Sequence, residues 1–407
     1  MAISKDVRIA AQEWTNEPFS AETRAEIRTL LDRGEDAAFE LTDRFYKRLA
    51  FGTGGMRGIM GAGTNRMNEY TIAAATQGLA NYIKAAGPEE AARGVVVSFD
   101  SRNNSEHFAR ITAAVFAENG IPVSIFPILH PVPCLAFAVR HLGAAYGVMI
   151  TASHNPPEYN GIKIFGPDGG QVVDPHDGAI IAEVNKVVIG SVEYRDYPVH
   201  REAGRIKVLD AGMDALFQEQ VLARITDRAA IARQHDIPVV YTPLHGSGNL
   251  PVRAGLAAAG FTNILIVREQ EAPDGNFPTV AKPNPEEGPA LKMAVALAER
   301  ENAELVLATD PDADRVGIAV RDLDGKFILL NGNQTGSLLV EYVLSSRKEQ
   351  GTLPADAAVV STIVTTGLLA AITRGYGAAF FETLTGFKHI GTKIREFELA
   401  RAAGKPS

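Results

Sequence analysis

Valine-rich segments recur three times along the chain, and each one opens onto the same arrangement. They begin near residues 95, 239 and 358, and each is followed by small polar residues and then by a helical pattern. Short apolar runs bounded by turn residues are typical of buried strands, and strands that alternate with helices indicate a sheet covered on both faces. We interpret the three segments as a weak internal repeat of one α/β plan. The sequence therefore predicts an α/β protein built from consecutive three-layer αβα domains with mixed sheets.

The length of the chain indicates how many such domains it holds. At about 150 residues per domain, a chain of 407 residues corresponds to about three domains. A polar link near 195–204 predicts the first boundary, and we expect domain I over 1–200, domain II over 201–321 and domain III over 322–407. Domain III is expected to be incomplete, because only a short tail follows its last loop and no strand remains to close a sheet.

Composition and charge exclude several classes of protein. The chain is 46% apolar and 22% charged, which is typical of a soluble globular protein. Its net charge of −8 and its scattered basic residues predict no nucleic-acid partner. No apolar run approaches the roughly 18 residues of a membrane span, and the start lacks the apolar core of a signal peptide. We therefore expect a cytoplasmic protein with no membrane partner, whose single Cys134 is a buried, inert thiol.

One serine follows an apolar segment in a way that indicates chemistry. Residues 145–150 have a buried strand pattern, and Ser153 then stands among small polar residues before a double proline that holds the backbone in a turn. Loops at the carboxyl ends of parallel strands carry the chemistry of open α/β sheets. Ser153 therefore offers an oxygen that could carry a phosphoryl group, if the acidic segment described next binds a metal and a phosphate. His154 and Lys163 are candidates to move a proton or to polarise that group. An ordinary strand-to-loop corner is the alternative interpretation.

Three aspartates alternate directly after another apolar strand. Asp310, Asp312 and Asp314 would repel one another unless a cation neutralised them, and hard oxygen ligands favour Mg²⁺ or Mn²⁺ over zinc. A calcium loop is excluded, because arginine stands where such a loop needs its glycine and its last glutamate. Arg315 beside the metal suits a site that holds a phosphate between two positive charges. A solvated acidic turn is the alternative.

Three further segments carry weaker signals. Residues 51–63 contain six glycines and Arg57, so the backbone and a guanidinium could approach a phosphate, with a flexible hairpin as the equal alternative. A loop around Lys388 and His389 is interpreted as an anion or substrate contact, and the structural alternative stays open. His245, in a turn rich in glycine and serine, is more typical of a structural cap at a helix start than of a catalytic group.

Taken together, these motifs resemble the α-D-phosphohexomutase family, the phosphoglucomutases and phosphomannomutases. The segment around Ser153 is similar to the family's phosphoserine loop, and the 310–315 segment is similar to its magnesium loop. Residues 51–58, 242–246, 273–278 and 385–388 also match family segments, in order along nearly the whole chain.

The resemblance implies a phosphohexomutase that interconverts hexose 1-phosphate and hexose 6-phosphate, with a bound hexose 1,6-bisphosphate as primer and intermediate. It implies one Mg²⁺ per chain, held by the phosphorylated Ser153 together with the three aspartates. The remaining residues that it implicates contact the phosphate, the substrate or a proton: Arg57, His154 and Lys163 in catalysis, and Arg315, Thr385, Gly386 and Lys388 in substrate binding.

The chain departs from the family pattern near its end. A sugar-selecting loop and a fourth domain, which grips the non-reacting phosphate, are expected beyond the 385–388 segment but do not occur before Ser407. We therefore expect a fragment or a natural short form that retains Mg²⁺ and turns sugar phosphates over poorly. Glucose, mannose and pentose phosphates stay open as substrates, and so do a phosphatase and a sugar-phosphate-binding protein without turnover. No oligomeric state is predicted.

Overall fold

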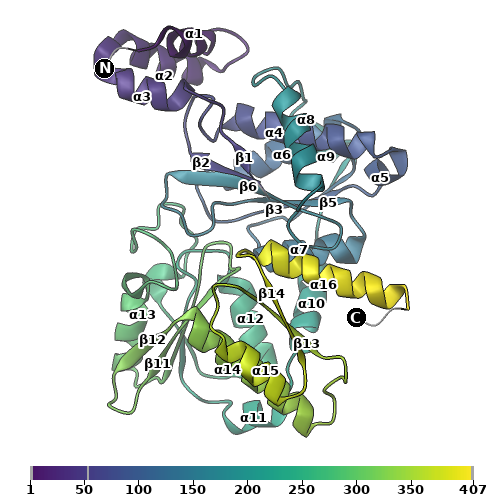
Figure 1. The fold of residues 1–407 in the computed structure, drawn as a ribbon. Helices are drawn as coiled ribbons and strands as arrows, with labels where there is room; N and C mark the ends of the chain where they lie inside the picture. The colour runs from purple at the N-terminus through teal and green to yellow at the C-terminus, as the bar shows by residue number, and fades with distance from the viewer. Residues whose placement is uncertain (1–2, 53–54, 405–407) are drawn as a thin grey trace. The chain divides into compact units, whose positions relative to one another are not determined.

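The computed structural model describes residues 3–52 and 55–404. Its backbone divides into two compact units, Met1–His130 with Leu135–Asp210, and Pro131–Cys134 with Ala211–Ser407. Each unit combines helices with a sheet of parallel and antiparallel strands, so the predicted α/β class with mixed sheets is confirmed (Figure 1). No helix in the described part of the chain combines the length and the apolar composition that a membrane crossing requires.

The first unit begins with short helices that pack on one another. They are α1 (Lys5–Glu13), α2 (Ala21–Asp32), a 3₁₀ helix (Gly34–Ala37) and α3 (Ala38–Phe45). The apolar pattern predicts helix over the whole 21–50 segment, but Gly34 has a φ of 58°, which ends α2, and the 3₁₀ turn that follows leads into α3. Stacked and edge-on rings of Trp14, Phe19 and Phe45 fill the core of this helical cluster.

A seven-stranded sheet forms the centre of the first unit, in the order β1-β2-β6-β5-β3-β4-β7. Strands β3, β4, β5 and β7 are parallel, and β1, β2 and β6 add antiparallel pairs at one side. The strands are β1 (Phe51–Gly52), β2 (Gly55–Ile59), β3 (Val95–Phe99), β4 (Val123–Ile125), β5 (Tyr146–Ile150), β6 (Tyr159–Phe165) and β7 (Ile206–Val208).

Helices cover both faces of this sheet. On one face lie α4, α6 and α8 (Figure 1), and on the other Leu135 and Val139 of α7 lie against Gly147 of β5. The helices are α4 (Glu69–Ala85), α5 (Pro88–Ala92), α6 (Ser105–Glu118), α7 (Val132–Leu142), α8 (His176–Lys186) and α9 (Tyr197–Glu202). Cys134 is buried, as predicted, and burial raises the pKa of its thiol, so it remains protonated and inert.

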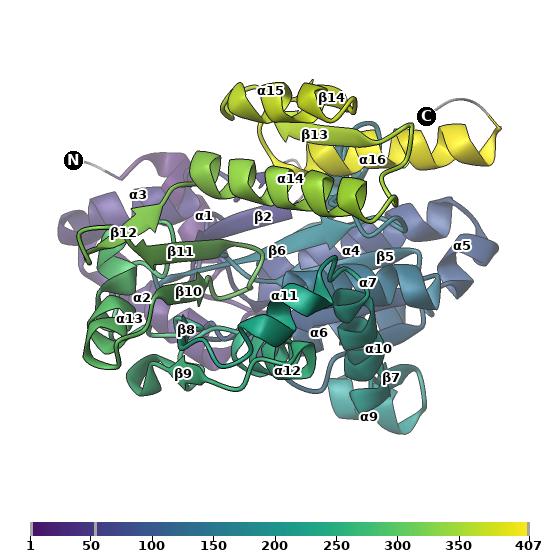
Figure 2. The ribbon, with the colours of Figure 1, turned by 90° about the horizontal axis from the view of Figure 1, so that it is seen from below.

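The second unit contains a five-stranded sheet in the order β12-β11-β10-β8-β9 and a separate parallel pair, β13-β14 (Figure 2). Its strands are β8 (Val239–Thr242), β9 (Ile264–Ile266), β10 (Leu305–Thr309), β11 (Val316–Arg321), β12 (Phe327–Leu330), β13 (Ala358–Thr362) and β14 (Ala379–Thr383). Its helices are α10 (Ala211–Leu222), α11 (Arg228–Arg233), α12 (Asn249–Ala259), a 3₁₀ helix (Arg268–Gln270), α13 (Gly288–Arg300), α14 (Gly332–Glu349), α15 (Leu368–Gly375) and α16 (Phe387–Ala402).

The predicted repeat corresponds to three strand–helix–strand units. They are β3–α6–β4, β8–α12–β9 and β13–α15–β14, and in each the two strands pair in parallel. The predicted boundaries, 1–200, 201–321 and 322–407, stay predictions. Residues 206–208 nevertheless pair with β4 and so extend the first sheet, which is why the first unit runs on to Asp210.

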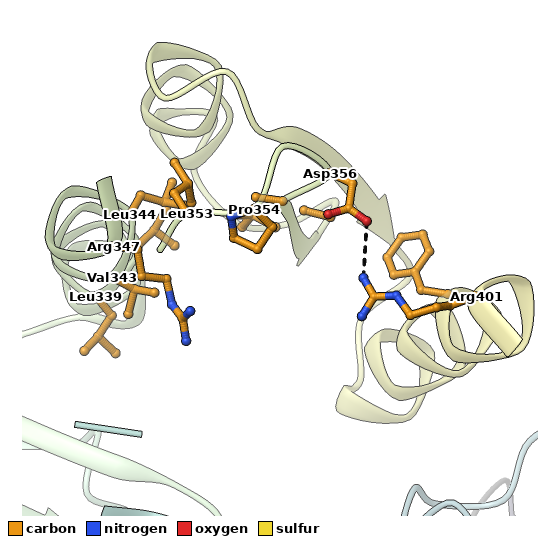
Figure 3. Close-up of a pocket in the computed structure, with 13 residues that line it drawn as sticks. Leu339, Val343, Leu344, Arg347, Leu353, Pro354, Asp356 and Arg401 are labelled. Atoms are coloured by element: carbon orange, nitrogen blue, oxygen red, sulfur yellow. Dashed lines mark hydrogen bonds and ion pairs between the residues drawn. The ribbon is translucent and has the colours of Figure 1, made fainter. Parts of the chain in front are cut away.

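A cavity of about 520 Å³ lies in the second unit between α14, β13 and α16. Leucine and valine side chains of α14 form one wall, and an ion pair of Asp356 with Arg401 lies at the other side (Figure 3). No predicted site residue is among the described residues that line it. The candidate site is therefore built from loops at the ends of strands, not from this cavity.

Candidate functional site

Ser153 lies just beyond the end of β5, whose five residues are all buried. Its φ of 55° is left-handed, a conformation that a non-glycine residue holds only when its surroundings impose it. The Ser153 N–H donates to the hydroxyl of Thr151 over 2.8 Å, and the Ser153 Oγ lies 3.2 Å from His154 Nδ1. The serine is 2% exposed and the histidine is half-buried.

Two groups that follow β3 hold this turn, and our sequence analysis did not identify them as site residues. The Asp100 carboxylate accepts a hydrogen bond from the Thr151 hydroxyl over 2.7 Å, and that hydroxyl in turn accepts from the Ser153 N–H. The Arg102 guanidinium donates to the Ser153 carbonyl over 2.7 Å. Because β3 and β5 are parallel neighbours, their carboxyl ends and the loops that follow them lie side by side.

Strands β6 and β2 bring two further predicted residues to the same sheet. Arg57 lies opposite Gly161 in the β2–β6 ladder, and its Nη1 donates to the Asn155 side-chain oxygen over 2.8 Å. Lys163 lies in β6 between Met149 of β5 and Gly55 of β2. The predicted glycine-rich loop is thus a β1–β2 hairpin, whose residues 53 and 54 lie outside the described residues.

The close approach of these strands depends on Gly161, and also on Gly55, where an added Cβ would lie 1.9 Å from the Ile162 carbonyl oxygen. A Cβ at Gly161 would lie 2.6 Å from the Met56 carbonyl oxygen and 2.7 Å from that of Thr151. Both contacts are with backbone atoms, so any larger residue would separate β6 from β2 or from the Ser153 turn.

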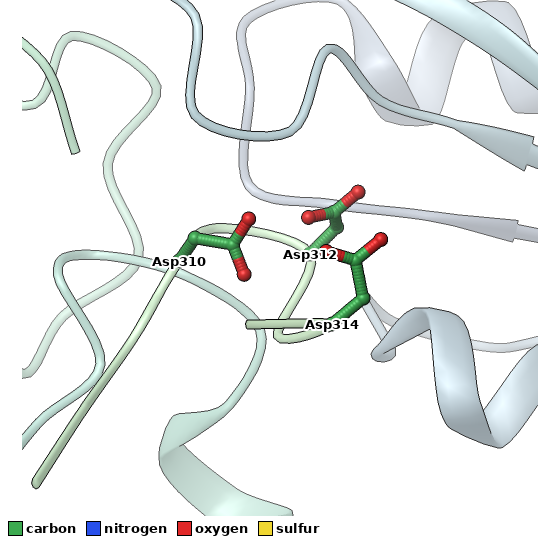
Figure 4. A group of neighbouring side chains, drawn as sticks. All are labelled: Asp310, Asp312 and Asp314. Atoms are coloured by element: carbon green, nitrogen blue, oxygen red, sulfur yellow. The ribbon is translucent and has the colours of Figure 1, made fainter. Parts of the chain in front are cut away.

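The three aspartates follow β10 and converge, as the sequence predicts. One oxygen from each of Asp310, Asp312 and Asp314 lies within 4.8 Å of the others, and the carboxylates turn toward a common space (Figure 4). Asp310 and Asp312 are fully buried, whereas Asp314 is exposed. The Arg315 N–H donates to Asp310 over 3.1 Å, and its side-chain Nε lies 4.0 Å from the same carboxylate.

This donor set fits a small hard cation. Oxygens bound side by side to Mg²⁺ at about 2.1 Å are about 3 Å apart, and oxygens on opposite sides are about 4.2 Å apart. Carboxylate oxygens that lie within 4.8 Å of one another reach that geometry with small movements of their side chains. Two of the three carboxylates are also buried away from water. In the protein interior like charges repel strongly unless a cation compensates them.

A turn after β8 is hydrogen-bonded to the metal loop, the segment that carries the three aspartates. The Ser247 N–H and hydroxyl both donate to the Pro311 carbonyl, each over 2.8 Å. His245 is buried, and its ring nitrogens contact the Ala272 carbonyl and the Thr279 hydroxyl at 3.1 and 2.9 Å. Both nitrogens are thus engaged within the protein, which is consistent with the structural role preferred for His245 from the sequence.

The third predicted segment lies at the start of α16. Thr385 and Gly386 precede the helix, Gly386 with a φ of 121°, and Lys388 lies in its first turn. The structure therefore brings the predicted residues into three groups. The first unit holds Arg57, Ser153, His154 and Lys163, and the second unit holds the acidic loop and the α16 segment. The roles assigned to these residues stay predictions.

Comparisons with known proteins identify the family to which this fold belongs. Family models described as phosphoglucomutase/phosphomannomutase α/β/α domains I, II and III match residues 48–188, 216–325 and 331–404. A human phosphopentomutase is 33% identical over 406 residues, which cover 97% of this chain and 66% of the relative. A phosphoglucomutase of Staphylococcus haemolyticus is 35% identical over 354 residues, covering 87% of this chain and 63% of the relative.

One solved structure illustrates the shared fold. A phosphoglucomutase/phosphomannomutase family protein from Burkholderia thailandensis superposes with a TM-score of 0.67 at 20% identity. The match covers 86% of this chain and 69% of the solved one. At that identity the likeness shows the fold alone. The three domain models nevertheless cover most of the chain in order, and the chain belongs to the phosphoglucomutase/phosphomannomutase family, the α-D-phosphohexomutases.

Proposed function

We propose that this chain is a magnesium-dependent phosphosugar mutase that acts on hexose phosphates, and that Ser153 carries the transferred phosphoryl group. The Ser153 turn is the observation that supports it most strongly. Its hydroxyl stands at the carboxyl end of a buried strand, in a left-handed backbone, with an imidazole nitrogen 3.2 Å away. Arg57, which contacts Asn155 of the same loop, offers a positive charge for a phosphate there.

The proposed reaction exchanges one phosphate ester for another. The bond between phosphorus and the Ser153 oxygen breaks as a sugar hydroxyl oxygen bonds to the same phosphorus, which yields a sugar bisphosphate. The hydroxyl proton passes to the Ser153 oxygen by way of His154 or Lys163. In the second half, the other phosphate of the bisphosphate returns to Ser153, and a proton returns to the sugar oxygen that it leaves.

The other proposed roles concern charge and positioning. Asp310, Asp312 and Asp314 would hold Mg²⁺, which when bound neutralises charge on the phosphoryl group. Arg315 would contact a substrate phosphate, and the α16 segment (385–388) would contact the substrate. Phosphoryl transfer depends mainly on such positioning and charge compensation.

A pentose phosphate is the second candidate substrate. The human relative is named a phosphopentomutase, whereas the Staphylococcus relative is named a phosphoglucomutase. Because the chain spans less than two thirds of the length of those relatives, the choice between hexose and pentose is a matter for experiment.

Intact mass spectrometry tests the proposal directly. After incubation with glucose 1,6-bisphosphate and Mg²⁺, we expect one phosphate adduct on the chain that is absent from Ser153→Ala and present in Ser191→Ala, a control at an exposed loop serine. Ribose 1,5-bisphosphate in the same assay separates hexose from pentose. No adduct with either donor would refute the phosphoserine, and steady release of inorganic phosphate would instead indicate a phosphatase.

A further inference from the structure

We propose that Arg102 is a positioning residue, and that its guanidinium sets the backbone of the Ser153 loop and thereby the direction of the Ser153 hydroxyl. The loop, residues 151–158, connects β5 to β6. Arg102 lies after β3, which is the neighbour of β5 in the sheet. The Arg102 side chain is fully buried, so it acts from behind the loop and does not reach solvent.

The guanidinium donates hydrogen bonds to four backbone carbonyls, three in the loop and one at the first residue of β6. Its Nη2 donates to the carbonyl oxygens of Ser153, at 2.7 Å, and of Asn155. Its Nη1 donates to those of Pro156 and Tyr159, at 2.9 and 3.0 Å. Charge-assisted hydrogen bonds of this kind are about twice as strong as neutral ones. Four of them to a single rigid plane define the path of the loop.

The charge of Arg102 is compensated locally. Its Nε lies 3.4 Å from Asp100 Oδ2, and Asp100 Oδ1 accepts from the Arg102 N–H over 3.0 Å and from the Ser105 hydroxyl over 2.7 Å. Because the carboxylate faces the guanidinium at the back of the loop, Arg102 is suited to hold backbone carbonyls. Arg57, in contrast, is exposed, and so is suited to contact a phosphate.

The amide side of the same turn is held through Thr151. Its hydroxyl donates to Asp100 and accepts from the Ser153 N–H, so the acid and the arginine grip the two peptide groups that flank Ser153. The φ of 55° at Ser153 is then imposed from both directions, which explains how a serine keeps a backbone that usually requires glycine or asparagine.

Arg102→Lys tests the geometry because it retains the charge and removes the planar fork. A lysine ammonium is a point donor and cannot span four carbonyls. Arg93→Lys is the matched control, since Arg93 also donates to two backbone carbonyls in the first unit, those of Gly143 and Ala144. Hydrogen exchange of the amides of residues 151–155, 158 and 159 should accelerate about tenfold or more in Arg102→Lys. It should not change in Arg93→Lys.

The catalytic readout rests on the function proposed above. In single turnovers with glucose 1,6-bisphosphate, the saturating rate of Ser153 phosphorylation should fall about 10- to 100-fold in Arg102→Lys. The half-saturating concentration should change less than about twofold, because Arg102 is buried behind the loop and does not touch substrate. Equal losses in Arg93→Lys, or a loss confined to half-saturation, would overturn the positioning role.

Two further results keep the outcomes separate. If the wild-type chain takes no phosphate, the proposed function fails, and hydrogen exchange alone still decides whether Arg102 positions the loop. If Arg102→Lys does not fold, Arg102→Gln replaces it, because glutamine keeps a planar donor but removes the charge and most of the bonds to the four carbonyls. Arg102→Gln should then accelerate exchange at Ser153 and its neighbours, and wild-type exchange there would refute the inference.

Discussion

Replacing one buried aspartate of the acidic loop should raise the stability of the metal-free protein. The oxygens of Asp310 and Asp312 lie within 4.8 Å of each other, and both side chains are fully buried. Two unit charges at that distance repel by about 3.5 kcal/mol at an effective dielectric constant of about 20. The Arg315 N–H and guanidinium, which contact Asp310, offset part of this energy. We therefore expect Asp312→Asn to stabilise the metal-free second unit by about 1–3 kcal/mol.

The assay is calorimetric melting in EDTA and in Mg²⁺. A gain of about 1–3 kcal/mol corresponds to a rise of about 2–10 °C in the melting transition of a unit of this size. Mg²⁺ at one hundred times its dissociation constant should stabilise the wild-type second unit by about 2.7 kcal/mol relative to EDTA. Most of that gain should be lost in Asp312→Asn, which lacks one ligand charge.

The control removes the same charge elsewhere in the unit. Asp324→Asn changes an exposed turn residue, so it should leave both the metal-free transition and its response to Mg²⁺ within about 0.5 kcal/mol of the wild type. The reasoning would be refuted if Asp312→Asn melted lower than the wild type in EDTA and still responded fully to Mg²⁺. In that case the carboxylates would be an ordinary hydrogen-bonded turn.

Two further predictions concern the first unit. Gly161→Ala should cost about 1–3 kcal/mol and lower the urea midpoint, because its Cβ would meet two backbone oxygens; a wild-type midpoint would contradict the close strand approach. Hydrogen bonds from Arg195 lower the pKa of Glu118 to about 2, so this carboxylate stabilises the fold above its unfolded pKa of about 4.5 and loses that effect as pH falls toward 2. Arg195→Met should therefore reduce the fall in urea midpoint between pH 5 and pH 2.5, and an undiminished fall would contradict the assignment.

Much of the fold could be predicted because the apolar periodicity is strong. The strands near residues 95, 146 and 239, and the helices that follow the first and third of them, occur where their patterns predict them. Short elements were harder to predict. Helix α9 and strand β7 lie in and just beyond a segment that is polar enough to be interpreted as a linker, because most of their residues face solvent.

The candidate site divides in the same way. Residues within one loop, such as the alternating aspartates, could be predicted because their spacing alone brings them together. Arg102 could not, because its partners are backbone carbonyls about fifty residues further along the chain. Every residue has a backbone carbonyl, so a sequence does not indicate which carbonyls a side chain will contact. The one available signal was that Asp100 follows a buried strand just as Ser153 does, which predicts that both lie at the same edge of a parallel sheet.

The serine and metal loops share a way of being held that suits phosphoryl transfer. Each follows a buried strand, each contains a non-glycine residue with positive φ (Ser153 at 55° and Ala313 at 49°), and each is bound through its carbonyls by a neighbouring loop. Arg102 supplies those bonds to the first loop and Ser247 to the second. A reaction that depends on positioning and charge compensation requires that such groups be held in place before substrate arrives. Loosening either support should therefore slow the proposed chemistry even when every group that contacts substrate is retained.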